Sequence, residues 1–208
     1  MTLARLAFAI IGVLCLAAAP LVRPAAATAG SADQFIAALG DNVIKVITDE
    51  SSTPDVKEQS FRQMFNEAFD SDEVMKFILG RHWRTATEEQ RREFRQAFED
   101  LAVKTYASRF GQYSGEQFKV RNAQRGATPD EYIVPSLIER PNGPPLRIDW
   151  KVRQYGENWR IADIVVEGVS MALTYRQEYS AFIQKHNGQL QALIDTMKAK
   201  VRENRAEN

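Results

Sequence analysis

Residues 146–170 alternate between apolar and polar side chains with a period of two, which constrains the fold more than any other part of the sequence. This period places the apolar side chains on one face of a β-strand and the polar ones on the other. The turn residues Gly156, Glu157 and Asn158 divide the stretch into two runs, as in a β-hairpin. The first run carries Leu146, Ile148, Trp150 and Val152 on its apolar face, and the second is expected to carry Trp159, Ile161, Asp163 and Val165 on one face.

Two more strands are expected before this hairpin. Residues 118–122 alternate in the same way, and residues 132–139 form a second strand that is interrupted by Pro135. A proline inside a strand indicates an edge position or a bulge, because it cannot donate a ladder hydrogen bond. The short turns between all these strands predict an antiparallel meander of four strands.

The rest of the chain after residue 30 is expected to supply helices that cover the apolar face of this sheet. Ser31 with Gln34, and Thr87 with Gln90, fit capping boxes at helix starts. The longest helix is predicted to run from Thr87 to about Tyr113, and its apolar side chains point in two different directions along its length. A bend, or an apolar space beside its second half, would explain this change. The predicted fold class is therefore α+β, a twisted antiparallel sheet packed against several helices, with no linker that would divide it.

The N-terminus has the layout of a secretory signal peptide. An unbroken apolar run covers residues 6–19, Pro20 breaks it, and small residues from Ala25 to Ala27 offer a cleavage site. We therefore expect a signal peptide over residues 1–27, a single domain over residues 28–208 and a periplasmic location. An uncleaved membrane anchor is the alternative. Cleavage would remove Cys15, the only cysteine, and change the net charge from zero to about −2.

No set of residues in the sequence predicts catalysis or metal binding. His82 and His186 lie on different predicted elements without the spacing of metal ligands. The stretch from Gly168 to Ala172 begins like a nucleophile elbow but lacks its second glycine, so Ser170 is interpreted as a helix cap. We therefore expect no enzyme activity, no cofactor and no metal. A net charge of zero also argues against a nucleic-acid partner.

Aromatic residues are numerous, with 11 Phe, six Tyr and three Trp. The simpler interpretation is a well-filled core. The alternative is an enclosed apolar cavity, in which a lipid chain would gain about 0.8 kcal/mol for each buried CH₂ group.

An ordered set of short segments resembles the MlaC family, also called the toluene-tolerance auxiliary component family, over about residues 32–201. The segments are Phe69-Asp70, Ile78-Leu79-Gly80, Trp83-Arg84, Thr87, Gln90-Arg91, Phe94, Phe98, Tyr106, Tyr113, Trp159 to Ile164, Glu167 to Ser170, and Tyr175-Arg176. The resemblance implies an NTF2-like shape and a periplasmic phospholipid carrier, with the acyl chains inside the protein and the head group facing water. The implied partners are an outer-membrane lipoprotein–porin complex and an inner-membrane ABC transporter with its periplasmic substrate-receiving subunit.

The resemblance transfers no ligand motif residue by residue, so candidate lipid-binding residues come from the expected geometry. They are Phe98, Leu101, Tyr106, Phe110, Val134, Ile148, Trp150, Val165, Val169, Met171 and Tyr175. The sequence does not decide which sheet face lines the cavity, and nothing in it demands more than a monomer.

Three rival functions stay open. The first is a carrier of a polycyclic lipid, as in the hopanoid-associated branch of the family. The second is an NTF2-like enzyme that uses Asp163, Glu167 or His82 as a base, and the third is an adaptor without a cavity.

Overall fold

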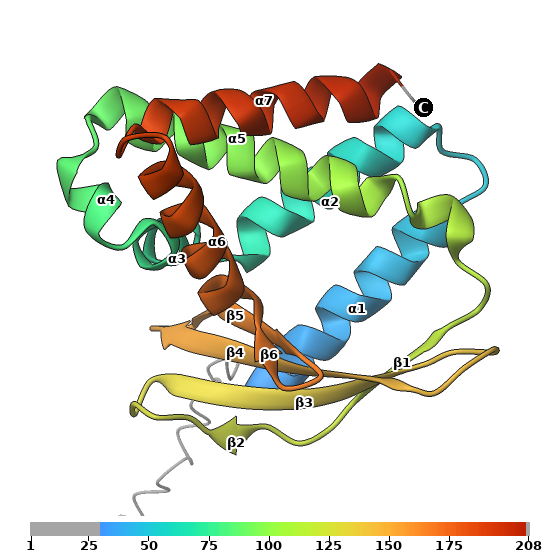
Figure 1. Cartoon of the computed structure of the whole chain (residues 1–208). Coiled ribbons are helices and arrows are strands. Elements are labelled where there is room, and N and C mark those ends of the chain that lie inside the picture. Colours follow the sequence, from blue (N-terminus) through green and yellow to red (C-terminus); the bar gives the residue numbers. More distant parts are fainter. Residues whose placement is uncertain (1–29, 207–208) are drawn as a thin grey trace, which may run out of the picture.

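The computed structural model describes residues 30–206, which form a layer of helices over an antiparallel sheet (Figure 1). The helices are α1 (Ala32–Thr48), α2 (Pro54–Ala68), α3 (Ser71–Leu79), α4 (Arg81–Thr85), α5 (Glu88–Ala107), α6 (Met171–Lys185) and α7 (Leu190–Ala206), with one 3₁₀ turn, η1 (Phe110–Gln112). The strands are β1 (Gln117–Val120), β2 (Gln124–Arg125), β3 (Glu131–Glu139), β4 (Leu146–Tyr155), β5 (Asn158–Val166) and β6 (Val169–Ser170). The predicted α+β class is confirmed. The expected signal peptide lies outside the described residues.

The helix starts follow the local sequence signals. The Thr87 hydroxyl accepts a hydrogen bond from the Gln90 backbone at 3.1 Å, and the Gln90 side chain accepts one from the Thr87 backbone at 3.1 Å. This reciprocal pair satisfies two donors that the first turn of α5 would otherwise leave free. The predicted end of that helix at Tyr113 is wrong, because α5 ends at Ala107 and the chain continues through the turn η1.

The sheet has the strand order β1-β3-β4-β5-β6, with β2 also paired to β3, and every pairing is antiparallel. The described residues therefore contain six strands, where four were predicted. The two additional strands, β2 and β6, have two residues each. Segments this short show no periodicity, so the alternation pattern could not reveal them.

Pro135 lies within β3, whose neighbours are β4 on one side and the pair β1 and β2 on the other. Its carbonyl oxygen accepts a hydrogen bond from the Arg121 backbone at 2.8 Å. Arg121 lies in the break between β1 and β2. The side of Pro135 that lacks an N–H donor therefore faces an interrupted edge strand. Proline is tolerated there because it cannot donate a ladder hydrogen bond.

A β-bulge in β5 moves two side chains to the face opposite the one predicted. Val152 pairs with Ile161 and Lys151 pairs with Asp163, so Ala162 is an extra residue in β5. An extra residue shifts the alternation by one position. Asp163 and Val165 therefore do not share a face with Trp159 and Ile161, and that prediction is wrong.

Two hydrophobic cores hold the fold together. One core joins α1 to the covered face of the sheet, and its fully buried side chains include Ile36, Val134, Val152 and Ile161. The other joins α2, α3, α5, α6 and α7, around Phe94, Met75, Ile78, Ile183 and Ile194. Phe69 packs against both cores.

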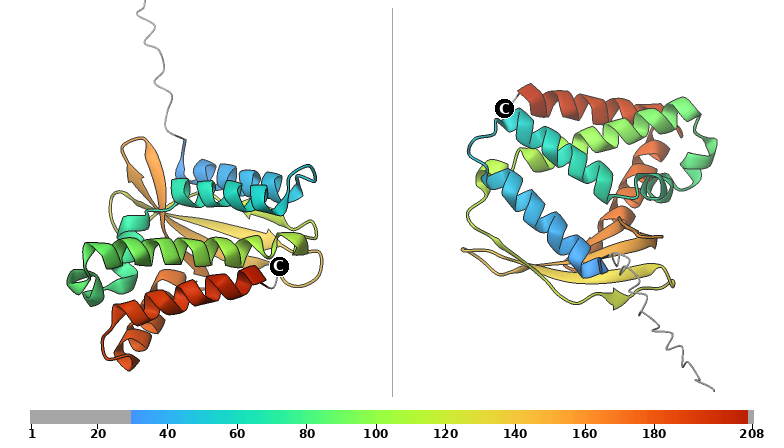
Figure 2. Two further views of the ribbon diagram at one scale, coloured as in Figure 1. Left: turned by 90° about the horizontal axis from the view of Figure 1, so that it is seen from above. Right: turned by 180° about the vertical axis from the view of Figure 1, so that it is seen from behind.

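The helices above the sheet are arranged in two groups. Seen from above, α1 and α2 lie along one side while α5 and α7 lie along the other (Figure 2). Along residues 30–206, no helix has the length and apolar character that crossing a membrane requires.

Candidate functional site

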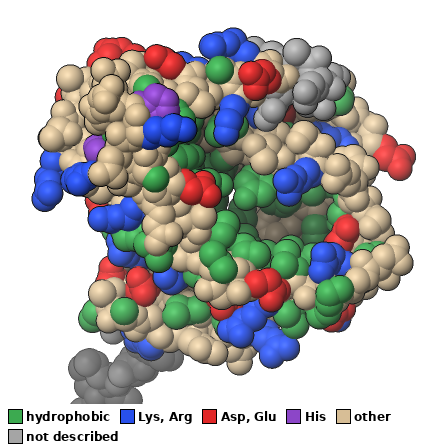
Figure 3. Space-filling model, in the orientation of Figure 1, with side chains coloured by type: hydrophobic (Ala, Val, Ile, Leu, Met, Phe, Trp, Pro, Cys, Tyr) green, Lys and Arg blue, Asp and Glu red, His purple; other side chains and the backbone are tan. Residues whose placement is uncertain are grey.

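An apolar cavity lies where the helical core meets β5. Its walls come from α2, α3, α5, β5 and α6. The lining residues are Phe65, Phe69, Ser71, Val74, Met75, Ile78, Phe98, Ala102, Tyr106, Ala162, Asp163, Ile164, Met171, Ala172 and Tyr175. Figure 3 shows that the protein surface is hollowed between the helical layer and the sheet, and that hydrophobic side chains gather around the hollow.

Aromatic rings in contact with one another build two of these walls. Phe65 and Phe69 stack with ring centroids 4.4 Å apart, at the end of α2. On the α5 and α6 side, Phe98 meets Tyr175 edge-on at 5.5 Å, and Tyr175 meets Tyr179 at 5.6 Å. Burial raises the pKa of the Tyr175 hydroxyl, as expected in a poorly hydrated environment.

Tyr106 extends the aromatic lining toward solvent. It lines the cavity yet is 46% exposed, so it lies where the cavity opens. Its ring is 6.3 Å from that of Phe61, which in turn contacts Phe110 edge-on at 5.4 Å. These three side chains form an aromatic edge between α2, α5 and η1.

Asp163 is the one carboxylate among the residues that line this cavity. It accepts hydrogen bonds from the Ser170 hydroxyl at 2.7 Å and from the Ala172 backbone at 3.0 Å, and it pairs with Lys151 at 3.1 Å. These contacts hold the start of α6 against the β5 bulge. Asp163 therefore has a structural role in positioning α6.

The other two candidate bases are engaged elsewhere. Glu167 accepts a hydrogen bond from the Arg147 backbone at 2.6 Å at the edge of the sheet. His82 lies on α4 beside Arg81, whose guanidinium donates to its ring at 3.4 Å. Neither lines the cavity. Residues 30–206 also contain no cluster of three or more His, Asp or Glu residues placed to hold a metal ion.

The eleven predicted binding residues separate into groups. Phe98, Tyr106, Met171 and Tyr175 line the cavity together. The other seven do not line it. Four of them lie in the interior: Leu101 packs on the helical core, Val134 and Trp150 belong to the core between α1 and the sheet, and Ile148 is buried. Phe110 contacts Phe61, Val165 pairs with Asp149 on the other face of the sheet, and Val169 is 53% exposed.

The sequence pattern did not predict that α2 and α3 contribute to the cavity. Phe65 and Phe69 were visible as apolar positions of a helix, and Val74, Met75 and Ile78 as those of the next. Their spacing shows that one helix face is buried, but it does not show what that face covers. Only the tertiary contacts of α3 with α6 and β5 bring these residues to the cavity.

The MlaC family model matches residues 37–199. The chain belongs to the MlaC family. This match covers most of the described residues, including all the elements that line the cavity.

Two proteins illustrate what this MlaC protein is similar to. The toluene tolerance protein ttg2D of Pseudomonas putida is 22% identical over 145 residues, which are 69% of this chain and 67% of the relative. A phospholipid-binding protein from Ralstonia solanacearum, solved in complex with a phospholipid, has a TM-score of 0.72 and 21% identity, and the match covers 84% of this chain and 99% of the other. At this level of identity, the second likeness establishes the fold.

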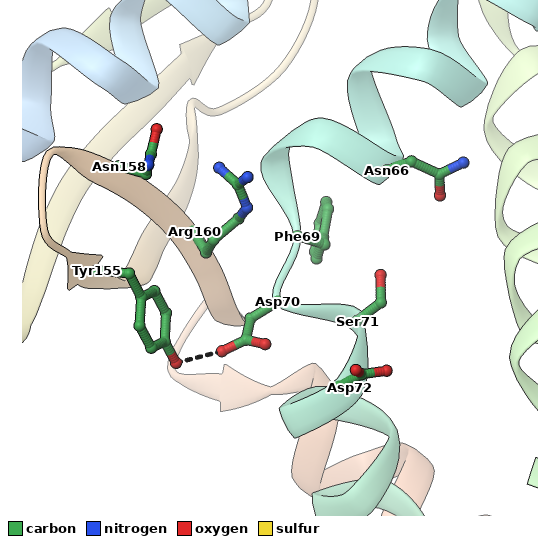
Figure 4. Close-up of a pocket in the computed structure, with 8 residues that line it drawn as sticks. All are labelled: Asn66, Phe69, Asp70, Ser71, Asp72, Tyr155, Asn158 and Arg160. Carbon is green, nitrogen blue, oxygen red and sulfur yellow. Dashed lines mark hydrogen bonds between the residues drawn. The ribbon is translucent and has the colours of Figure 1, made fainter.

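A second, polar pocket of this MlaC protein lies between the start of α3 and the β4–β5 hairpin (Figure 4). It is lined by Asn66, Phe69, Asp70, Ser71, Asp72, Tyr155, Asn158 and Arg160. The Tyr155 hydroxyl donates a hydrogen bond to Asp70 across this pocket. That hydrogen bond raises the pKa of Tyr155.

Proposed function

We propose that this protein is a periplasmic lipid carrier that holds phospholipid acyl chains in the apolar cavity. The observation that carries the proposal is the lining of that cavity, whose one carboxylate is held by partners on α6, β4 and β6. Each methylene group moved from water into such a lining contributes about 0.8 kcal/mol to binding. Membership of the MlaC family, and the phospholipid complex of the Ralstonia solanacearum protein, support the same function.

The cavity must widen when it takes a lipid. The cavity measures about 70 Å³, whereas pockets for small ligands measure roughly 300–1,000 Å³. We propose that acyl chains extend from the cavity into the hollow of Figure 3, between the helical layer and the sheet. A partner that favours the wider state would then promote loading or release.

We also propose where the carrier works and what it meets there. A signal peptide over residues 1–27 would export it to the periplasm. It would receive or deliver lipid at an outer-membrane lipoprotein–porin complex and at an inner-membrane ABC transporter with a periplasmic substrate-receiving subunit. A monomer suffices for this shuttle, because the cavity is built by the elements of one chain.

The proposal is tested by native mass spectrometry of the protein purified from periplasm without detergent, followed by extraction of any bound lipid. The expected result is a phospholipid that copurifies with the protein. Ala102→Trp should greatly reduce the amount, because Ala102 lines the cavity and a tryptophan there would fill it. Ala181→Trp is the matched control, since Ala181 is exposed on α6.

The outcomes separate the candidate functions. Equal phospholipid in the wild type and Ala102→Trp would contradict the assignment of the cavity. A copurifying hopanoid would keep the carrier function and replace the ligand. A folded protein that neither copurifies with lipid nor takes it from vesicles would contradict the carrier function.

A further inference from the structure

The apolar cavity and the polar pocket share part of their walls. Phe69 and Ser71 line both of them. Phe69 directly follows α2 as its C-cap residue, and its ring stacks on Phe65, which lines only the apolar side. A molecule with apolar chains and a polar end could therefore place the two parts on either side of Phe69.

The charged side chains of the polar pocket differ in how they are paired. Asp72 pairs with Arg95. Asp70 accepts hydrogen bonds from the Tyr155 hydroxyl and, at 3.4 Å, from the Glu73 backbone. Arg160 donates to the Trp159 carbonyl oxygen at 2.9 Å, and in the described part of the chain it forms no ion pair with a carboxylate. The pocket thus has one carboxylate paired with a cation, one carboxylate that accepts from neutral donors, and one guanidinium without a carboxylate partner among the described residues.

The position of Arg160 on β5 supports a role in binding. Asn158 and Arg160 are two residues apart on one strand, so their side chains lie on the same face. Figure 4 shows both side chains directed away from Asp70. A guanidinium beside a carboxamide offers several N–H donors in one direction, which suits the oxygens of a phosphate group.

We propose that the polar pocket binds the phosphodiester group of the lipid whose acyl chains occupy the apolar cavity, with Arg160 as its charge partner and Asn158 as a second donor. This inference rests on the proposed carrier function and adds a head-group site to it. It requires one lipid to pass beside Phe69, with its glycerol region near Ser71. It also implies that the carrier prefers phospholipids to uncharged lipids of the same chain length.

The test compares two lipids that differ only in the phosphate-containing head group. Lipid-free protein is incubated with vesicles that contain phosphatidylglycerol and diacylglycerol with identical acyl chains, and native mass spectrometry gives the ratio of the two complexes. Loss of a hydrogen bond to a charged group weakens binding by about tenfold. Arg160→Gln should therefore lower the ratio of the phosphatidylglycerol complex to the diacylglycerol complex by about tenfold. Binding of diacylglycerol should stay unchanged, which shows that the variant is folded. Arg147→Gln, an exposed arginine paired with Asp149, is the control that should keep the wild-type ratio.

The outcomes distinguish the head-group site from the carrier function. An equal ratio in the wild type and Arg160→Gln would overturn the head-group site while both proteins still carry lipid. Equal loss of both lipids in Arg160→Gln would also overturn it, because Arg160 would then act on the fold. A wild type that binds neither lipid would overturn the carrier function and the head-group site together.

Inorganic phosphate separates a lipid head group from a free anion. At millimolar concentration it should shift the NMR resonance of the Arg160 side-chain N–H in lipid-free protein and leave it unshifted in the phospholipid complex. An equal shift in both forms would assign the pocket to a free anion and overturn the proposal.

Discussion

Phe69 stacks on Phe65 with ring centroids 4.4 Å apart and ring planes inclined by 22°. The same Phe69 side chain packs against the helical core and against the core between α1 and the sheet. It also lines the apolar cavity and the polar pocket. The end of α2 is therefore the place where the two layers and the two cavities meet.

Phe69→Ala should both destabilise the protein and weaken lipid retention. Loss of a partly buried phenylalanine costs about 2 kcal/mol of unfolding free energy, somewhat less than in a fully buried core. The loss also opens the wall between the cavity and the polar pocket. Urea denaturation and the rate of lipid transfer to acceptor vesicles measure the two effects.

Phe77→Ala is the control, because Phe77 is 44% exposed and lines neither cavity. Lipid transfer at the wild-type rate in Phe69→Ala would show that Phe69 does not retain the ligand.

Asp163→Ala tests whether this carboxylate positions α6. Removing it leaves Lys151 and the Ala172 N–H without their partner, which should cost roughly 2–4 kcal/mol of unfolding free energy. Thermal unfolding monitored by circular dichroism gives this value. Asp149→Ala removes the partner of an exposed arginine on the same sheet and should cost much less. A variant Asp163→Ala as stable as the wild type would contradict the structural role and reopen a catalytic one.

Tyr179 makes the stability of the helical core depend on alkaline pH. Burial raises the pKa of its hydroxyl well above the ordinary value of 10.0. The folded state therefore holds this proton more tightly than the unfolded state does. The resulting stability is complete below pH 10 and is lost as the pH rises above that value.

Tyr179→Phe removes this ionisable group and keeps the ring that contacts Phe94 at 6.0 Å. We expect the variant to unfold at a higher pH than the wild type in an alkaline titration followed by circular dichroism. Tyr106→Phe is the comparison, because Tyr106 is 46% exposed. Identical alkaline midpoints for Tyr179→Phe and the wild type would contradict this account.

Much of the fold could be predicted because its signals are local. The capping pair Thr87 and Gln90, the turn at Gly156 and the alternation of β4 all involve residues close in sequence. The bulge at Ala162 could not be predicted, because residues on both faces of β5 are apolar after that point. After a register shift of one residue, apolar side chains would therefore still face the core.

The cavity was only partly predictable for a related reason. Phe98 and Tyr175 were expected on helices that cover the sheet, and both line the cavity. Phe65 and Met75 line it as well, although they belong to helices whose packing partners cannot be deduced from spacing alone. Val165 was assigned to the wrong face through the bulge. Side-chain type shows which residues are buried, whereas the long-range contacts decide what they surround.

Photocrosslinking with a phospholipid that carries a diazirine at the middle of one acyl chain tests the central claim most directly. The lipid is loaded from vesicles, irradiated, and the modified peptides are identified by mass spectrometry. We predict adducts on the cavity walls, in residues 74–78, 98–106 and 171–175. Adducts confined to the opposite face of β3, around Ile133 and Leu137, would contradict the account, because the acyl chain would then bind outside the cavity.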